Sequence, residues 1–473
     1  MKFGTLNYIY MKNLIIHELQ QFLYGLRFPI ALVIVLIMFA ASSLTYIGEY
    51  KETIKKYHEL TASQEQQLRN LASNASHVAI NSRSYQLPPR SGGFISDCGE
   101  MNMPNTIIYN AYYRMGFDAG STKSNPFILP SNRINWGFIV LVLFGFLSVI
   151  FSFDAVSGEK EERTLALCLS NPVKRSHILI SKFIAINGLL ITFAIIGMIF
   201  SLIILMLSPA VPITSKTIIE IALYLAFIVF FTGSMTAIGM FSSVMSRNSS
   251  ISLLLSVSIW LMFMIAIPNF AQTIGMSLYP VEKSNTVWEK IWSKRNEIEA
   301  SFPEGKWSSN SGDPFYSRHE IRAEMMTAFA RNEEDFLIVQ RNERFAQMDK
   351  TRKWTWISPL AVFEYGAEAL LDGGYLRIRK NYNDLQNFQT QYFQWFKDLD
   401  AKDNDSPHWY NAREDYSTTK KPVSYEEIPQ FTERSSTIGE RLSETMKYLM
   451  IMLVYMGVMF FVTMMKFQRY DVR

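Results

Sequence analysis

A dense run of charges, EKEER at residues 159–163, lies between two uncharged apolar stretches of the chain, 136–153 and 183–207. Leucines follow at alternate positions from 165 to 169. Asn171-Pro172 then ends any helix, because the residue before a proline is pushed out of the α region. The link between the two apolar stretches is therefore predicted to hold a short amphipathic helix at a membrane surface. Its charged end is predicted to face water, where a soluble partner could bind it.

The stretch GEKEERTLALCLSNPVKRSHILISKF, residues 158–183, resembles the link after the second span in type-2 ABC permeases, the exporter-like membrane subunits of ATP-binding-cassette systems. In that family a glycine–glutamate–basic–glutamate run, a leucine-rich turn and an NP/LP-V-x-R step form the coupling helix that docks on the ATPase subunit. The resemblance implies that its leucines fill an apolar cleft of the ATPase, while the charges pair at the rim. The alternative is an ordinary solvated loop that follows the positive-inside tendency. The residues to which the resemblance assigns ATPase coupling are Glu159, Glu161, Glu162, Arg163, Leu165 and Leu169.

Other patterns that would indicate catalysis or cofactor binding are missing from the sequence. Gly305-Lys306-Trp307 lacks both the spacing of a GxxxxGK[ST] phosphate loop and the Ser/Thr that would reach magnesium. The His-Glu pairs that begin at His17, His58 and His319 each lack the second histidine of an HExxH motif. The chain is therefore predicted to be a transport subunit rather than an enzyme. It is expected to have no cofactor of its own, with ATP and Mg²⁺ bound by a partner ATPase.

The elements that must position the charged link are membrane spans. A bilayer core of about 30 Å needs about 20 helical residues, and at least six windows of this chain are apolar and long enough to cross it. The net charge of +4 is too small to indicate a nucleic-acid partner. The predicted spans are residues 28–47, 136–153, 183–207, 217–241, 251–267 and 448–465. The predicted fold class is an all-α membrane protein with six transmembrane helices and two outward-facing insertions.

The segment before the first span, residues 1–27, contains an amphipathic piece, Leu14–Leu26. Such a pattern predicts a helix lying along the membrane surface, which the permease resemblance describes as an elbow before the first span. An ordinary flanking segment is the alternative. Glu220, near the start of the fourth span, is the one ionisable candidate within the spans, and it is interpreted as an interfacial residue that snorkels to the headgroups.

Two polar insertions interrupt the spans, at residues 48–135 and 270–443. In the first, Glu49–Asn70 is predicted to be helical, whereas the rest is rich in Ser, Asn, Pro and Gly and is predicted to form loops. The second is predicted to be a mostly helical domain that is soluble when expressed alone. Its Ser358-Pro359 step, the aromatic helix that follows, and the closing RYDVR at 469–473 resemble a permease subgroup with a large periplasmic insertion before the last span.

Orientation follows from the basic residues in short segments near span ends. Such residues gather on one side of the membrane, whereas the short link on the other side offers only Lys216. Both termini, the link 154–182 and the tail 466–473 are therefore predicted to be cytoplasmic, in a bacterial inner membrane. The residues on the predicted cytoplasmic side are Lys2, Lys12, Arg27, Lys160, Arg163, Lys174, Arg175, Lys182, Arg247, Lys466, Arg469 and Arg473.

Three functions fit these patterns. The first is the permease subunit of an ABC exporter, paired with a second copy or a related permease and with cytosolic ATPases. The second is mechanotransmission, in which ATP turnover moves the outward domain against a periplasmic partner and nothing crosses the membrane. The third is a receptor or scaffold without an ATPase. The apolar spans do not indicate a substrate.

Overall fold

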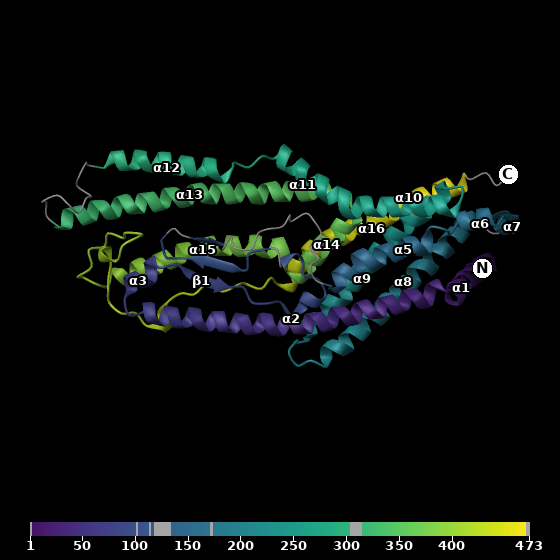
Figure 1. Cartoon of the computed structure of the whole chain (residues 1–473), viewed down its shortest axis with the longest axis horizontal. Coiled ribbons are helices and arrows are strands. Elements are labelled where there is room, and N and C mark those ends of the chain that lie inside the picture. The colour runs from purple at the N-terminus through teal and green to yellow at the C-terminus, as the bar shows by residue number, and fades with distance from the viewer. Residues whose placement is uncertain are drawn as a thin grey trace.

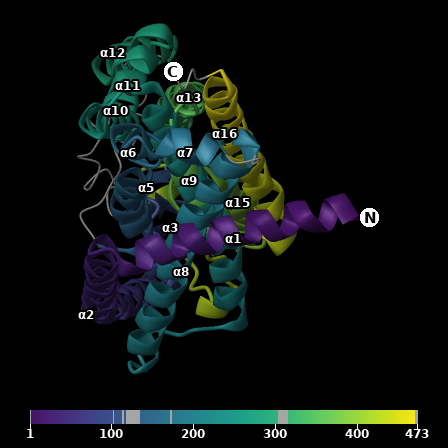
Figure 2. The ribbon, with the colours of Figure 1, turned by 90° about the vertical axis from the view of Figure 1, so that its right-hand side faces the viewer.

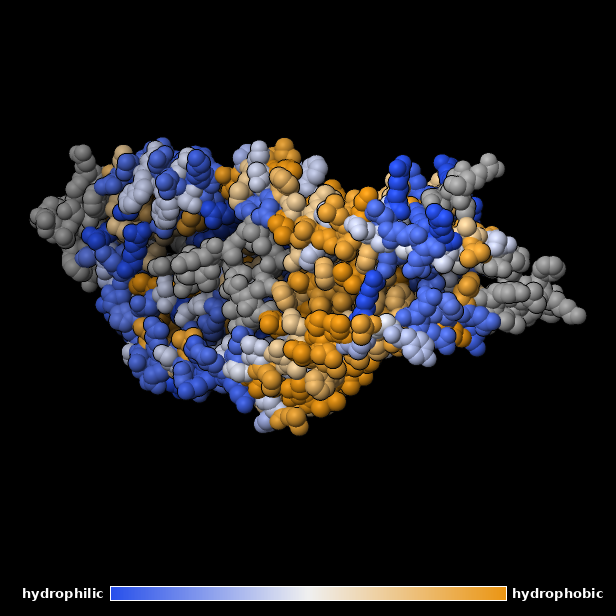
Figure 3. All heavy atoms as spheres, turned by 45° about the vertical axis from the view of Figure 1, so that its right-hand side comes forward, coloured by the Kyte–Doolittle hydropathy of each residue, from blue (hydrophilic) through white to orange (hydrophobic). Residues whose placement is uncertain are grey.

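Six helices in the described part of the chain are long and apolar enough to cross a membrane, which confirms the predicted all-α membrane fold. The computed structural model describes residues 2–100, 103–112, 115–117, 134–170, 174–302 and 315–469. Figure 3 shows a broad apolar band over the bundle of these helices, with polar surface on either side. The helices are Arg27–Leu71, Trp136–Glu161, Arg175–Met206, Ser215–Met245, Ser249–Leu278 and Ile438–Gln468.

The first spanning helix, α2 (Arg27–Leu71), does not end near residue 47, where the predicted span ends. It continues without a break into the polar part of the molecule (Figure 1). The charged half suits a helix, because Lys56–Glu52 and Arg69–Glu65 are ion pairs one turn apart. The helices α8 (Arg175–Met206), α9 (Ser215–Met245) and α16 (Ile438–Gln468) also extend beyond the predicted spans.

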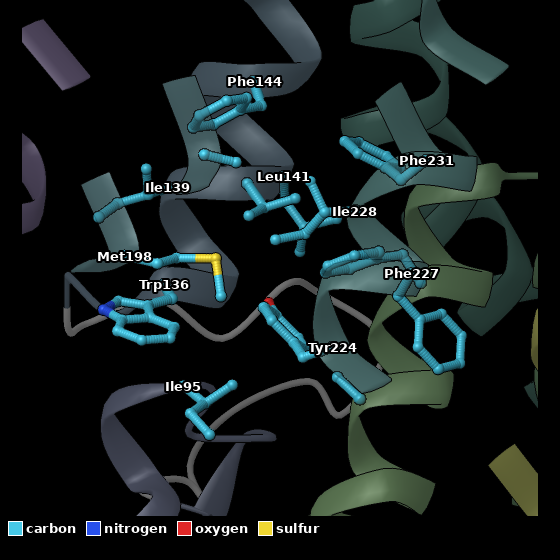
Figure 4. Packing of buried hydrophobic residues seen from close by; sticks show 14 of the residues in the cluster. Ile95, Trp136, Ile139, Leu141, Phe144, Met198, Tyr224, Phe227, Ile228 and Phe231 are labelled. Carbon is cyan, nitrogen blue, oxygen red and sulfur yellow. The ribbon is translucent and has the colours of Figure 1, made fainter. Parts of the chain in front are cut away.

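The second and fifth spans each contain a π-helical segment, a wider turn that often lies at functional positions. In the second span, η4 (Ile139–Phe144) joins α4 (Trp136–Phe138) to α5 (Gly145–Ser152). The fifth span consists of α10 (Ser249–Leu261), the π-helical η5 (Met262–Ala266) and α11 (Ile267–Leu278). Figure 4 shows Leu141 and Phe144 of η4 facing Ile228 and Phe231 of α9 across the core of the bundle.

The two insertions build one body, here called the polar domain. A single apolar cluster joins the C-terminal end of α2, the rest of the first insertion and the second insertion. The first insertion holds a three-stranded antiparallel sheet in the order β1-β2-β3, where loops were predicted. Strands of three or four residues are too short to show an alternating pattern in the sequence. The elements are α3 (Ala75–Ile80), β1 (Arg83–Gln86), η1 (Ser91–Phe94), β2 (Thr106–Tyr109), β3 (Met115–Phe117), α12 (Ser284–Ser301), α13 (Phe315–Thr355), α15 (Gly374–Asp400), η6 (Asp415–Ser417) and η7 (Tyr425–Glu427).

One helix of the second insertion leaves the polar domain and enters the bundle. Helix α14 (Pro359–Leu371) packs against α9 and α16, and the ring of Phe363 lies 5.4 Å from that of Tyr224 and 5.1 Å from that of Phe231. Ser358 caps the helix by accepting from the Ala361 N–H, and its hydroxyl donates to the carbonyl of Phe263 in η5 at 2.9 Å. The second insertion is therefore packed partly within the bundle and partly in the polar domain.

The opposite end of the bundle carries both chain ends and is here called the terminal end. Helix α1 (Lys2–Tyr24) crosses it, as Figure 2 shows, and packs against α8. The short helices α6 (Ser157–Glu161) and α7 (Thr164–Ser170) follow the second span at the same end.

Candidate functional site: a surface at the link between the second and third spans

Helix α6 is held by the ends of two spanning helices. The Lys160 ammonium donates to the carbonyls of Val244 and Ser246, at 2.8 and 3.0 Å, at the C-terminal end of α9. The Glu161 carboxylate accepts from the N–H and hydroxyl of Ser249, at 3.1 and 2.7 Å, at the start of α10. Both placements are favourable, because a cation lies at a helix C-terminus and an anion at a helix N-terminus. They also satisfy backbone groups that a helix end leaves unpaired. The charged run thus fixes the orientation of α6 relative to α9 and α10.

A buried lysine joins the same helix to two more elements. The ammonium of Lys182 on α8 lies 2.8 Å from the carboxylates of both Glu18 on α1 and Glu159 on α6. Lys182 is 5% exposed, so this ion triad is largely removed from solvent. Removing one partner of such a buried set leaves charges without compensation. Glu159 is therefore a structural anchor in this chain, although the resemblance assigns it to the ATPase contact.

The leucines of α7 divide between two faces. Leu165 and Leu169, one helical turn apart, both point into an apolar cluster, and Leu165 is 3% exposed. Leu167 points away and is 68% exposed. The other buried members of the cluster are Val156, Leu179, Met240, Val244 and Phe467. Leu165 is therefore buried inside the molecule, and Leu167 is the exposed leucine of α7.

Glu162 and Arg163 form the exposed turn between α6 and α7, and Arg163 adopts a left-handed conformation with φ of 58°. Together with Leu167 they make a small mixed surface, here called the coupling surface. Six residues were assigned to ATPase coupling from the sequence, and three of them, Glu161, Glu162 and Arg163, are exposed. Glu161 is bound to Ser249, so Glu162 and Arg163 are the two of the six that are exposed and do not anchor the link. No sequence pattern signals that Lys160 and Lys182 anchor this link.

Two further contacts hold the terminal end together. Arg27 at the start of α2 forms an ion pair with Asp154, with its Nη1 2.7 Å from the carboxylate. Arg175 at the start of α8 donates to the carbonyl of Gln468 at 2.9 Å, at the C-terminal end of α16.

Within the described residues, no group of three or more His, Cys, Asp or Glu side chains is placed to hold a metal ion.

At the end of the bundle next to the polar domain, Glu220 is not an exposed interfacial residue. It is 7% exposed, and its carboxylate accepts from the Arg441 guanidinium of α16 at 2.7 Å. The same Arg441 nitrogen donates to the carbonyl of Leu370 at 3.0 Å. This contact ties α9, α14 and α16 together. No sequence pattern near Glu220 signals a partner more than 200 residues away.

Six helices long and apolar enough to cross a bilayer are the architecture of a multi-pass membrane protein. The chain belongs to the ABC-2 family transporter protein family, whose sequence profile matches residues 12–472. It is thus a type-2 ABC permease, which confirms the resemblance found in the link 158–183, and membership implies an ABC ATPase as a partner in general. No curated protein matches the chain.

Proposed function

We propose that this chain is the permease subunit of an ABC exporter in a bacterial inner membrane, with its terminal end in the cytoplasm. The observation that carries the proposal is the exposed coupling surface on helices anchored to the bundle. A separate cytosolic ATPase binds ATP and Mg²⁺ and docks on Glu162, Arg163 and Leu167. Leu165 and Leu169 support the surface from inside.

The anchoring explains how ATP hydrolysis would reach the spans. Because Lys160 and Glu161 bind α9 and α10, a displacement of α6 moves both helices. Because Glu159 shares Lys182 with Glu18, the same displacement is felt by α8 and α1. One docking event therefore acts on four helices. A second copy of this chain, or a related permease, completes the transporter together with a second ATPase.

A second candidate function is mechanotransmission to a periplasmic partner, with nothing transported. Two observations favour it. Helix α2 runs without a break from the terminal end of the bundle into the polar domain, and α14 connects that domain to α9 and α16. Substrate flux in proteoliposomes separates the two functions. A receptor or scaffold without an ATPase, the third candidate, is excluded if an ATPase co-purifies from native membranes.

The docking proposal is tested by co-purification of the ATPase with variants of the full chain. We expect Leu167→Ala, and the double reversal Glu162→Lys with Arg163→Glu, to weaken ATPase recovery and stimulated turnover at equal permease levels. Loss of a central apolar anchor at an interface costs about 2 kcal/mol or more, which corresponds to roughly 30-fold in affinity. Leu60→Ala is the matched control, because Leu60 is an exposed leucine on the far half of α2. Recovery equal to wild type in both variants would place the ATPase contact elsewhere.

A further inference from the structure

Strand β1 lies at the edge of the three-stranded sheet, and one of its sides is not paired with another strand of the described chain. Its other side pairs with β2 in an antiparallel register that places Gln86 opposite Thr106. The Leu87 N–H donates to the Asn105 carbonyl at 2.8 Å. Because bonded and non-bonded positions alternate in an antiparallel pair, residues 83, 85 and 87 bond to β2. The N–H and C=O groups of Ser84 and Gln86 therefore point away from β2.

These outward main-chain groups have no hydrogen-bond partner within the described part of the chain. Ser84 and Gln86 are both half-buried. Ser84 does contact α2, but through its hydroxyl, which accepts from the Gln64 amide at 3.0 Å. Main-chain groups removed from water normally have partners, and a free strand edge is a template on which another chain can pair.

Two cavities, of about 220 and 480 Å³, lie along this free edge between β1 and α2, and together they are here called the edge groove. The smaller cavity has Ser84 in its wall, and the larger has Gln86. Figure 1 shows α2 running past β1 along the polar domain. Residues 430–432 form another wall of the smaller cavity, where the Phe431 N–H donates to the Tyr109 hydroxyl at 3.2 Å. The two residues with unpaired main-chain groups therefore line an open space beside the strand.

The α2 wall of the edge groove presents rings and uncharged polar groups. Tyr46, Tyr50, Thr53 and Tyr57 line the larger cavity and follow one another at alternate spacings of four and three residues, so they lie on one face of the helix. The rings of Tyr46 and Tyr50 stack with their centroids 5.5 Å apart. The charged residues of the groove already have partners, so the groove does not require a charged ligand. These pairs are Lys56 with Glu52, Glu65 with Arg69, Arg90 and Arg377 with Glu100, Asp97 with Arg90, and Arg83 with the carbonyl of Pro429.

The edge groove does not lie between the spanning helices. Its walls come from α2 and the two insertions, and among the described residues no other spanning helix contributes to them. On α2 the lining begins at Tyr46, at the end of the predicted first span, and continues to Leu71. A solute that crosses the membrane passes along the spans, so a molecule held in this groove is a partner rather than a cargo.

We propose that the free edge of β1 is a docking site for an extended, uncharged segment of a partner protein, which adds a strand beside Ser84 and Gln86 in the edge groove. The main chain of the segment bonds to the unpaired groups of these two residues, which is the way a peptide adds to a sheet edge. Its alternate side chains enter the two cavities and pack on Tyr50 and Tyr57. The site is independent of the proposed ATPase docking, which lies at the terminal end.

The test uses the full chain in lipid nanodiscs and a synthetic pool of uncharged heptapeptides built from Ser, Thr, Gln, Val and Tyr. Affinity selection identifies the tightest binder, which is then made singly with a fluorescent label. Hydrogen–deuterium exchange is expected to be rapid at the Ser84 and Gln86 amides of the chain alone. With the peptide bound, we expect exchange at both amides to slow by about tenfold or more.

Two analogues of that peptide separate strand pairing from contacts made by side chains alone. One analogue is N-methylated at its odd positions and the other at its even positions. Because only one of these two sets of N–H groups faces β1, we expect one analogue to bind roughly tenfold more weakly and the other to bind like the parent peptide. Equal affinities of the two analogues would overturn the proposal.

On the protein, Gln86→Pro removes one outward N–H and leaves the bonds to β2 in place, and proline is tolerated on edge strands. We expect Gln86→Pro to bind the peptide roughly fivefold more weakly. Gln86→Ala is the matched control, because it loses the same side chain but keeps the N–H, and it is expected to bind like the wild type. Melting temperatures of the two variants check that the sheet stays folded.

Two other occupants of the groove would each overturn the proposal. Slow exchange at Ser84 and Gln86 in the chain alone would show that a segment of this chain already covers the edge. ATP-dependent passage of the peptide into proteoliposomes that contain the permease and its ATPase would make the peptide a cargo. A pool without any binder would also overturn the proposal.

Discussion

Lys182 and Lys160 position the link by different means, since one neutralises two carboxylates and the other caps a helix end. Lys182→Ala removes the cation between Glu18 and Glu159 and leaves two carboxylates facing each other. We expect a loss of about 3–5 kcal/mol in stability, seen as a lower melting temperature in detergent. Lys174→Ala, at an exposed position just before α8, is the control. A triple variant that also carries Glu18→Gln and Glu159→Gln should recover much of the loss; equal melting of the single and triple variants would contradict the ion-triad account.

Position 374 requires a glycine because of its left-handed backbone conformation and because the carbonyl of Cys98 lies close to it. Its φ is +57°, and a Cβ at this position would lie 2.3 Å from the carbonyl oxygen of Cys98. We expect Gly374→Ala to destabilise the junction of α14 and α15 by about 1–3 kcal/mol, measured by thermal unfolding. Gly439→Ala on α16 meets no atom within 4 Å and serves as the control. Similar melting of the two variants would show that the Gly374 turn relaxes freely.

Single elements differ in how well the sequence predicts them. The spans were predictable because about twenty consecutive apolar residues are what a helix needs to cross a bilayer. Helix α14 was not, because its thirteen residues, PLAVFEYGAEALL, include two glutamates and are too short to span. The burial of Glu368 is explained only by its partner Arg352, which another helix, α13, supplies. The same holds for α7, where alternate leucines allow either face to be internal, and Val156, Leu179 and Phe467 decide which.

A buried ion network joins the first insertion to the second and gives the polar domain a pH dependence. The Arg377 guanidinium contacts Glu433 at 2.6 Å and Glu100 at 3.2 Å, and Arg90 lies 2.8 Å from Glu100. Burial alone would raise the pKa of Glu100, but Arg90 and Arg377 outweigh it and hold that pKa below its ordinary value. Stability from this site is therefore present above the ordinary pKa of a glutamate and lost as the pH falls through the lowered one.

We accordingly expect the wild-type melting temperature to fall steeply in acid below about pH 4.5. Glu100→Gln should melt at a lower temperature at neutral pH and show a shallower acid dependence. The measurement is differential scanning fluorimetry across pH 3 to 7. An unchanged slope in Glu100→Gln would assign the acid sensitivity to other carboxyls.

At the scale of the whole molecule, the polar domain depends on both insertions and on the bundle. The segment 270–443 expressed alone would expose α14 and lack the first insertion, with which it shares an apolar cluster. We now expect this fragment to aggregate or to unfold without a cooperative transition. A soluble, monomeric fragment with a sharp thermal transition would show that the second insertion folds by itself after all.

The orientation in the membrane can be tested with introduced cysteines. Cys98 is buried and therefore unsuited to labelling. For the experiment, the native Cys168 is first changed by the substitution Cys168→Ser. In intact spheroplasts, an impermeant thiol reagent is expected to label Ser293→Cys on α12 and to spare Ala166→Cys on α7 until the cells are lysed. The reverse pattern would invert the predicted topology.

The unbroken course of α2 has a geometrical consequence. At 1.5 Å per residue its 45 residues measure about 68 Å from end to end. A tilt of about 5° at the Arg27 end therefore displaces the Leu71 end by about 6 Å, if the helix stays straight. The helix is a lever arm, and a small rotation where Arg27 meets Asp154 becomes a displacement of more than a side chain's width beneath the sheet.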